Sequence, residues 1–162
     1  LFQYIIKRNV VINMSKLNLE YESFKAEDTR EFAKMLAKEA KEGQIYLLSG
    51  DLGTGKTAFA QGFAQGLGIE DYVNSPTFTI MQIYDKGRLP LYHFDVYRIG
   101  DSSEMDELGY EEYFFGNGIS LVEWPEMIED ILPDDAIRIT IEKDLTRGFD
   151  YRLIKVKEGI DV

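Results

Sequence analysis

Cysteine is absent from the 162-residue chain, and His93 is its only histidine. The absence of cysteine excludes disulfide bonds, thiolate metal sites and cysteine nucleophiles. A single imidazole also excludes the His-rich sites that bind zinc or iron, because such sites use two or more histidines. Any metal ion that the chain binds must therefore take oxygen ligands, which favours Mg²⁺ or Ca²⁺.

Basic side chains and long apolar runs are also scarce. The 18 Lys and Arg residues are outnumbered by 29 Asp and Glu residues, which leaves a formal net charge of −11. Affinity for nucleic-acid phosphates comes mainly from Lys and Arg, so an overall basic clamp on nucleic acid is excluded and only a local basic patch stays open. No apolar run approaches the roughly 18–20 residues that span a bilayer. We therefore expect a cytoplasmic protein without a membrane partner.

The composition is that of a folded domain, with 44% apolar and 29% charged residues. The length suits one domain. Met14, followed by Ser15 and Lys16, is typical of a natural start. We therefore expect residues 1–13 to be an upstream extension and residues 14–162 to form a single domain. The alternative is a genuine additional strand at residues 3–12.

Hydrophobic periodicity predicts a mixed α/β order of elements. Phe32, Met35, Leu36 and Ala40 fall at helical spacing in a helix that opens near residue 27 and that Gly43 is expected to end. The short apolar runs 45–49 and 119–123 are typical of strands buried on both faces. Further strands are predicted at 17–24, 78–84, 89–96, 136–142 and 150–157, with helices at 56–67, 102–108, 110–115 and 125–132. This alternation indicates one compact α/β domain.

The most informative residues are Gly50-Asp51-Leu52-Gly53-Thr54-Gly55-Lys56-Thr57, hereafter the phosphate loop, which match G-x-x-x-x-G-K-[ST]. Glycines let successive backbone N–H groups point at a phosphate, and the following helix presents its positive end to the same anion. Lys56 is expected to bridge the β- and γ-phosphates, and the Thr57 hydroxyl to hold Mg²⁺. The alternative is a glycine-rich turn with an exposed lysine. The expected nucleotide-binding residues are Asp51, Leu52, Gly53, Thr54, Gly55, Lys56, Thr57 and Ala58, with the Asp51 side chain pointing outward.

Two acids at predicted strand ends compete as partners of the metal. Asp95 follows the run 91–94, and Glu123 follows the cleaner apolar run 119–122. Either could bind a nucleotide-bound Mg²⁺ directly or through water, or orient the attacking water. The alternatives are an ordinary turn or ion-pair acid for Asp95, and a solvated strand end for Glu123.

The polar loop 74–78 follows the helix of the phosphate loop. A hydroxyl in such a loop often senses the γ-phosphate through Mg²⁺ in nucleotide switches, so Thr77 is the first candidate and Ser75 the second. A hydroxyl-capped turn is the alternative. Arg98 fits phosphate contact or a surface ion pair, His93 fits a structural role better than a base, and Trp124 fits adenine stacking, a partner contact or core packing.

Five stretches together resemble the TsaE (YjeE) family, the small bacterial P-loop ATPases of tRNA threonylcarbamoyladenosine biosynthesis. They are GDLGTGKT (50–57), NSPTF (74–78), YHFDVYRI (92–99), ELGYEEYF (107–114) and LVEWPE (121–126). The resemblance covers about residues 18–157. It implies an α/β, P-loop NTPase-like three-layer fold whose central sheet is mostly parallel with added antiparallel strands.

The resemblance also implies ATP and Mg²⁺ as cofactors and slow intrinsic hydrolysis. It implies partnership with the TsaD–TsaB heterodimer, which modifies adenosine beside the anticodon, so tRNA would be reached only through that complex. Carried over by position, Lys56, Thr77, Asp95 and Glu123 are the expected catalytic residues. Thr57, Thr77, Asp95 and Glu123 are expected at the metal, and Trp124 beside the nucleotide. The rival hypotheses are a small-molecule kinase with the same loop and a non-catalytic nucleotide-gated adaptor.

Overall fold

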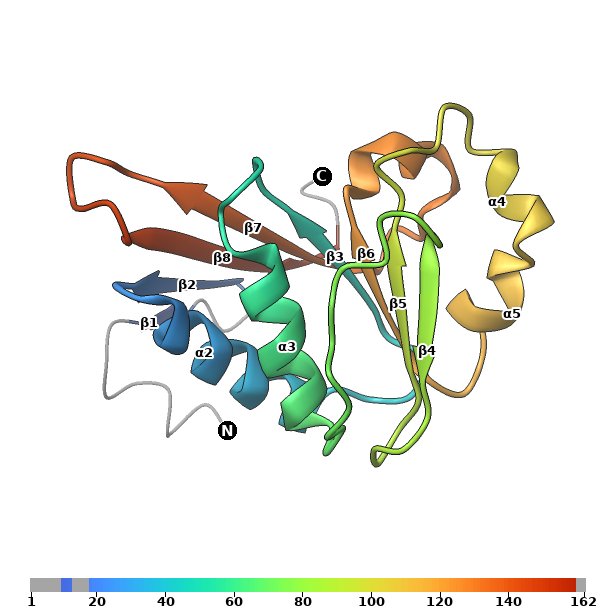
Figure 1. Cartoon of the computed structure of the whole chain (residues 1–162), viewed down its shortest axis with the longest axis horizontal. Helices are drawn as coiled ribbons and strands as arrows, with labels where there is room; N and C mark the ends of the chain where they lie inside the picture. Colours follow the sequence, from blue (N-terminus) through green and yellow to red (C-terminus); the bar gives the residue numbers. More distant parts are fainter. Residues whose placement is uncertain (1–9, 13–17, 160–162) are drawn as a thin grey trace.

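The apolar runs that predicted buried strands lie side by side as strands β3 (Ile45–Ser49) and β6 (Ile119–Glu123) in the middle of the sheet (Figure 1). The computed structural model describes residues 10–12 and 18–159. The other strands are β1 (Val10–Ile12), β2 (Asn18–Ser23), β4 (Met81–Tyr84), β5 (Leu91–Asp95), β7 (Ile137–Lys143) and β8 (Arg152–Glu158). The helices are α2 (Ala26–Glu39), α3 (Lys56–Gly66), α4 (Glu104–Glu107), α5 (Tyr110–Phe114) and the 3₁₀ helix η1 (Pro125–Ile131).

The centre of the sheet is parallel and its edges are antiparallel. The strand order is β1-β2-β8-β7-β3-β6-β5-β4. Strands β7, β3, β6 and β5 run parallel, whereas β4 pairs antiparallel with β5, and β8, β2 and β1 extend the other side antiparallel. The carboxyl ends of β3, β5 and β6 therefore meet at one edge of the sheet. The predicted mixed α/β fold, with a parallel core and added antiparallel strands, is confirmed.

Two hydrophobic cores on opposite faces of the sheet make the fold three-layered. Successive side chains of a strand point to opposite faces. In β3, Tyr46 and Leu48 pack in the core formed with α2 and α3, whereas Ile45 and Leu47 pack in the core formed with α4, α5 and η1. Burial on both faces explains why this strand reads as an unbroken apolar run. In Figure 1, α2 and α3 lie side by side.

Helices α2 and α3 approach each other closely because α3 carries glycine at the contact. A Cβ placed on Gly62 would lie 2.2 Å from the Arg30 carbonyl oxygen, and one on Gly66 would lie 2.4 Å from the Lys34 carbonyl oxygen. The obstructing atoms are backbone, so they cannot move aside as a flexible side chain would. Close packing holds α3, and with it the loop that precedes it, against the sheet.

We expect Gly62→Ala to destabilise the protein by about 1–2 kcal/mol, because an overpacking cost of about 2–3 kcal/mol outweighs the gain of about 1 kcal/mol in helix propensity. For a chain of this size the melting temperature should fall by roughly 2–8 °C. Gly100→Ala is the matched control, since its Cβ would meet only the end of the Glu104 side chain, at 3.5 Å. Equal melting temperatures for the two variants would contradict the close approach.

Several predicted boundaries are wrong, each for a physical reason that the structure shows. Helix α2 ends at Glu39 rather than at Gly43, and the Arg88 guanidinium donates to the Ala37 and Ala40 carbonyls at the helix end. The strand predicted from residue 78 starts only at Met81, because Ile80 adopts φ +64° and its N–H donates to the Pro76 carbonyl at 2.7 Å. The segment after Trp124 is a 3₁₀ helix with a kink at Ile128.

The start of the domain is only partly within the described residues. Strand β1 (Val10–Ile12) pairs antiparallel with β2, while residues 1–9 and 13–17 lie outside the described part. The expectation that residues 1–13 are an upstream extension to a domain over 14–162 therefore stays a prediction. Within the residues that the structure describes, no helix is both long and apolar enough to cross a bilayer.

Candidate functional site

The glycine-rich loop joins β3 to α3, as predicted, and its conformation depends on its glycines. Gly53 and Gly55 have φ of +74° and +104°, a region that side-chain-bearing residues rarely adopt. A Cβ on Gly50 would lie 2.6 Å from the Thr54 hydroxyl and 2.8 Å from the Ile141 carbonyl oxygen. The loop thus leads straight into the first turn of α3, where unpaired backbone N–H groups favour an anion.

Lys56 is the first residue of α3, and its side chain folds back over the loop. Its ammonium donates to the carbonyl oxygens of Gly50 and of Asp51, the latter at 3.1 Å, and lies 4.1 Å from the centre of the Trp124 ring. Burial lowers the pKa of Lys56, and the nearby carboxylates, Glu123 foremost, oppose that shift. The side chain is therefore a cation held largely by backbone oxygens and an aromatic face, which a phosphate can replace as partners.

Asp95 and Glu123 lie side by side at the carboxyl ends of β5 and β6, where they are partners in the strand register. They are only 3% and 2% exposed. The Ser75 hydroxyl lies 2.6 Å from an Asp95 oxygen and 3.1 Å from a Glu123 oxygen, and the Thr77 hydroxyl donates to Asp95 at 3.1 Å. Loop 74–78 is thus attached to both acids, with Ser75 reaching the pair and Thr77 reaching one of them.

His93 is fully buried next to Glu123, with its Nε2 atom 3.0 Å from a carboxylate oxygen. An ionised carboxylate can only accept, so Nε2 carries the proton and donates it. The other ring nitrogen, Nδ1, has no hydrogen-bond partner among the described residues. The hydrogen bond from Nε2 fixes the orientation of the Glu123 carboxylate, a positioning role that agrees with the structural role expected from the sequence.

These groups open on one cavity of about 560 Å³ at the carboxyl edge of the sheet. Its lining combines Leu52, Gly53, Gly55, Lys56, Thr57, Ser75, Thr77, Asp95, Tyr97, Glu123 and Trp124. Of the predicted nucleotide-binding residues, Asp51, Thr54 and Ala58 do not line it. Asp51 is exposed as expected, and the Thr54 hydroxyl is used within the loop, where it donates to the Asp51 carbonyl at 2.9 Å.

Tyr97 is the cavity residue that sequence reasoning missed. Its ring centre lies 4.9 Å from that of Trp124, and its backbone N–H donates to Asp95 at 3.1 Å. Its position two residues after a strand-end acid was the available signal. Arg98, a candidate for phosphate contact, does not line the cavity, because its guanidinium lies 4.4 Å from the ring centre of the exposed Phe78.

The donor set of the cavity suits a hard cation that brings further oxygen ligands with it. The candidate ligands Thr57, Thr77, Asp95 and Glu123 all offer oxygen. Within the described part of the chain, no group of three or more His, Cys, Asp or Glu side chains could hold a metal ion alone. Mg²⁺ is usually bound by one or two carboxylates together with substrate phosphates and water, so the residues present fit nucleotide-bound Mg²⁺.

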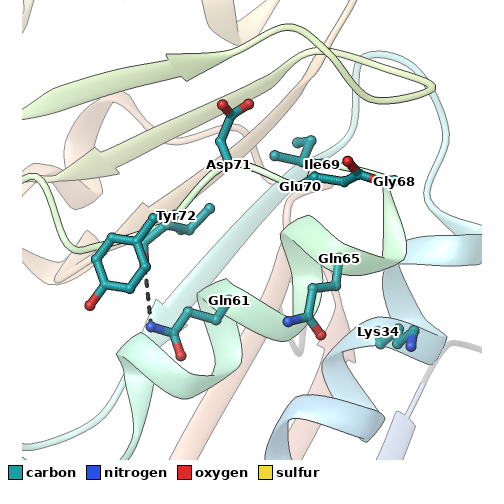
Figure 2. Close-up of a pocket in the computed structure, with 9 residues that line it drawn as sticks. Lys34, Gln61, Gln65, Gly68, Ile69, Glu70, Asp71 and Tyr72 are labelled. Atoms are coloured by element: carbon teal, nitrogen blue, oxygen red, sulfur yellow. Dashed lines mark hydrogen bonds between the residues drawn. The ribbon is translucent and has the colours of Figure 1, made fainter.

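A second hollow, of about 630 Å³, lies along α2, α3 and residues 68–73 (Figure 2). Amide side chains and separate charges line it, among them Lys34, Gln61 and Gln65. Gln61 is already engaged, since its amide donates to the Val73 carbonyl at 3.2 Å. This hollow contains none of the strand-end acids or loop glycines, so the cavity at the carboxyl edge is the candidate site.

Comparisons with known proteins agree with this geometry. The family model described as "Threonylcarbamoyl adenosine biosynthesis protein TsaE" matches residues 23–149. The tRNA threonylcarbamoyladenosine biosynthesis protein TsaE of Bacillus subtilis is 51% identical over 77% of this chain and 78% of its own. The protein of the same name from Treponema pallidum is 38% identical over 72% of this chain and 85% of its own.

A solved structure is similar to this chain in three dimensions as well. The crystal structure of Bacillus subtilis YdiB superposes with a TM-score of 0.77 at 41% identity, over 91% of this chain and 90% of that one. The matched family residues contain the phosphate loop, loop 74–78 and both strand-end acids. The chain therefore belongs to the TsaE family.

Proposed function

We propose that the protein binds ATP with Mg²⁺ and hydrolyses it slowly, in support of threonylcarbamoyladenosine modification of tRNA beside the anticodon. The observation that carries this proposal is that one cavity is lined by the phosphate loop and by two buried carboxylates. The hydroxyls of loop 74–78 bond these carboxylates in the same cavity. The relatives named for this biosynthesis supply the biological setting.

In this proposal each group of the site has its own role in binding the nucleotide. The loop N–H groups and the start of α3 receive the phosphates, and Lys56 exchanges its backbone carbonyl partners for phosphate oxygens. Thr57, Thr77, Asp95 and Glu123 would hold the metal, which would supply positive charge to neutralise the phosphates. Tyr97 and Trp124 form an aromatic wall of the cavity, beside the bound nucleotide.

Loop 74–78 is the element that we propose to respond to the γ-phosphate. Its hydroxyls bond the same carboxylates that would bind the metal, so occupation of the site competes with those bonds. Two aromatic side chains are exposed here, Phe78 at the end of the loop (84% exposed) and Tyr72 just before it (82% exposed). A change in the loop thus changes an apolar surface that a protein partner can bind.

We propose the TsaD–TsaB heterodimer as that partner, with tRNA reached through the complex and the whole acting in the cytoplasm. The net charge of −11 makes the chain a poor tRNA binder by itself. The kinase hypothesis needs arginines in a mobile lid, yet Arg88 caps α2 and Arg98 lies over Phe78. Neither lines the cavity, which favours hydrolysis over transfer to an acceptor.

The test is phosphate release from ATP, measured for the protein alone and with TsaD–TsaB and tRNA. We expect slow release alone and faster release in the complex, because docking completes or reorders the loop. A phosphorylated product that forms only with an added acceptor would select the kinase instead. Nucleotide binding without turnover, even in the full complex, would select the adaptor.

A further inference from the structure

The outer side of the phosphate loop is held by two cations from the far end of the chain. The Lys143 ammonium donates to the Leu52 carbonyl at 3.3 Å. The Arg152 guanidinium donates to the Thr54 carbonyl at 2.9 Å and to the Gly53 carbonyl at 3.4 Å. Three consecutive carbonyls of the loop thus bind cations that come from outside the motif.

The two cations are placed together by the sheet. Lys143 ends β7, Arg152 begins β8, and they are partners in the antiparallel register. Arg152 is also anchored to the turn between these strands, because its guanidinium donates to the Phe149 and Tyr151 carbonyls at 2.9 Å and 2.7 Å. Its planar fork therefore joins that turn to the phosphate loop, a geometry that a lysine does not reproduce.

Holding the carbonyls outward determines where the N–H groups point. In a planar trans peptide, the carbonyl of one residue and the N–H of the next point in opposite directions. Bonds to the carbonyls of Leu52 and Thr54 therefore direct the N–H groups of Gly53 and Gly55 away from the cations, and both glycines line the cavity. The N–H between them, that of Thr54, is used within the loop, donating to Asp51 at 3.2 Å.

We propose that Lys143 and Arg152 are positioning residues that preform the phosphate loop for an anion. Glycines allow the loop many conformations, and the two cations select the one with N–H groups facing the cavity. Their charges also polarise the bonded peptides, which strengthens the N–H groups as donors. Arg152 lies beyond residues 23–149 that the family model matches, so the device involves a residue outside that match.

The proposal rests on nucleotide binding at this site, and its test separates the two. We would measure ADP binding without metal from the emission of Trp124, the only tryptophan of the chain. We would also measure hydrogen exchange of residues 50–56 in the nucleotide-free protein. We expect Arg152→Ala to weaken ADP binding about tenfold and to speed exchange in the loop, with Lys143→Ala showing a smaller change in the same direction.

The matched control is Arg147→Ala, in the same turn. Arg147 pairs with Glu22 and contacts Tyr151 but not the loop, so binding and loop exchange should stay as in the wild type. The ADP affinity of Arg152→Lys should lie between those of the wild type and Arg152→Ala, because lysine keeps the charge but lacks the planar fork of the guanidinium. A positioning role further predicts a raised KM for ATP with kcat nearly unchanged.

The possible outcomes separate the positioning role of the two cations from nucleotide binding itself. If Arg152→Ala and Lys143→Ala both bind ADP and exchange loop hydrogens as the wild type does, the positioning role is overturned. Lys143→Ala should leave the β7–β8 hairpin folded, so an effect of this variant cannot be ascribed to unfolding of the hairpin. Lys143 is exposed, and among the contacts described its ammonium bonds only the Leu52 carbonyl. Absence of ADP binding in the wild type would overturn the proposed function, while the exchange data would still decide whether the cations order the loop.

Discussion

Replacing Lys56 by alanine is expected to weaken ATP binding by about 10- to 100-fold and to abolish measurable hydrolysis. A charge-assisted hydrogen bond contributes about 1.5–3 kcal/mol, and each 1.4 kcal/mol corresponds to about a tenfold change in affinity. The loss in turnover is larger because Lys56 would stabilise charge that develops on the transferred phosphoryl group. Binding is measured by calorimetry, since the loss of Lys56 also changes the surroundings of Trp124.

Lys86→Ala is the control for this variant. Lys86 is an exposed lysine that pairs with Asp71 on the surface, outside the cavity. Its replacement removes the same charge from the chain, so any effect of net charge alone would appear in both variants. Unchanged ATP binding in Lys56→Ala, in a protein that still melts cooperatively, would remove the basis for a phosphate site at this loop.

Glu123→Gln is expected to lower turnover by about 100-fold or more while ATP binding changes by less than about tenfold. General-base or charge-positioning groups typically contribute about 10²–10⁴ to rate. Glutamine keeps the shape and can still accept from His93, so the variant removes charge and leaves the packing in place. Comparing phosphate release at saturating ATP with binding separates the two effects.

The stability of Glu123→Gln adds an independent check. Asp95 and Glu123 are buried next to each other, so neutralising one relieves repulsion between like charges. We expect the free protein to melt at the same temperature or higher. Glu126→Gln is the control, since Glu126 is exposed and bonds only the Ser49 hydroxyl at 3.4 Å among the contacts described. Equal losses of binding, turnover and stability would indicate a structural role for Glu123.

Much of the site could be predicted because its main parts are local in the chain. The phosphate loop occupies eight consecutive residues, Gly50 to Thr57, and the apolar run before it and the helix after it carry their own signals. Both acids were located by the same kind of reasoning, since each ends a buried strand. The ends of helices and strands were less predictable. Arg88, from the hairpin between β4 and β5, bonds the carbonyls at the end of α2, and the left-handed conformation of Ile80 shifts the start of β4 to Met81.

The sequence by itself determined that this chain has a glycine-rich loop of the G-x-x-x-x-G-K-[ST] pattern between an apolar run and a helical segment, and that no thiol or His-rich metal chemistry is available. Only the tertiary structure decided that Asp95 and Glu123 become neighbours, that Ser75 reaches both, and that His93 orients one of them. It also brought Lys143 and Arg152 to loop carbonyls that lie 91 and 98 positions away in the chain. These contacts depend on strand order and register, which arise from packing of the whole sheet and which no local pattern of residues encodes.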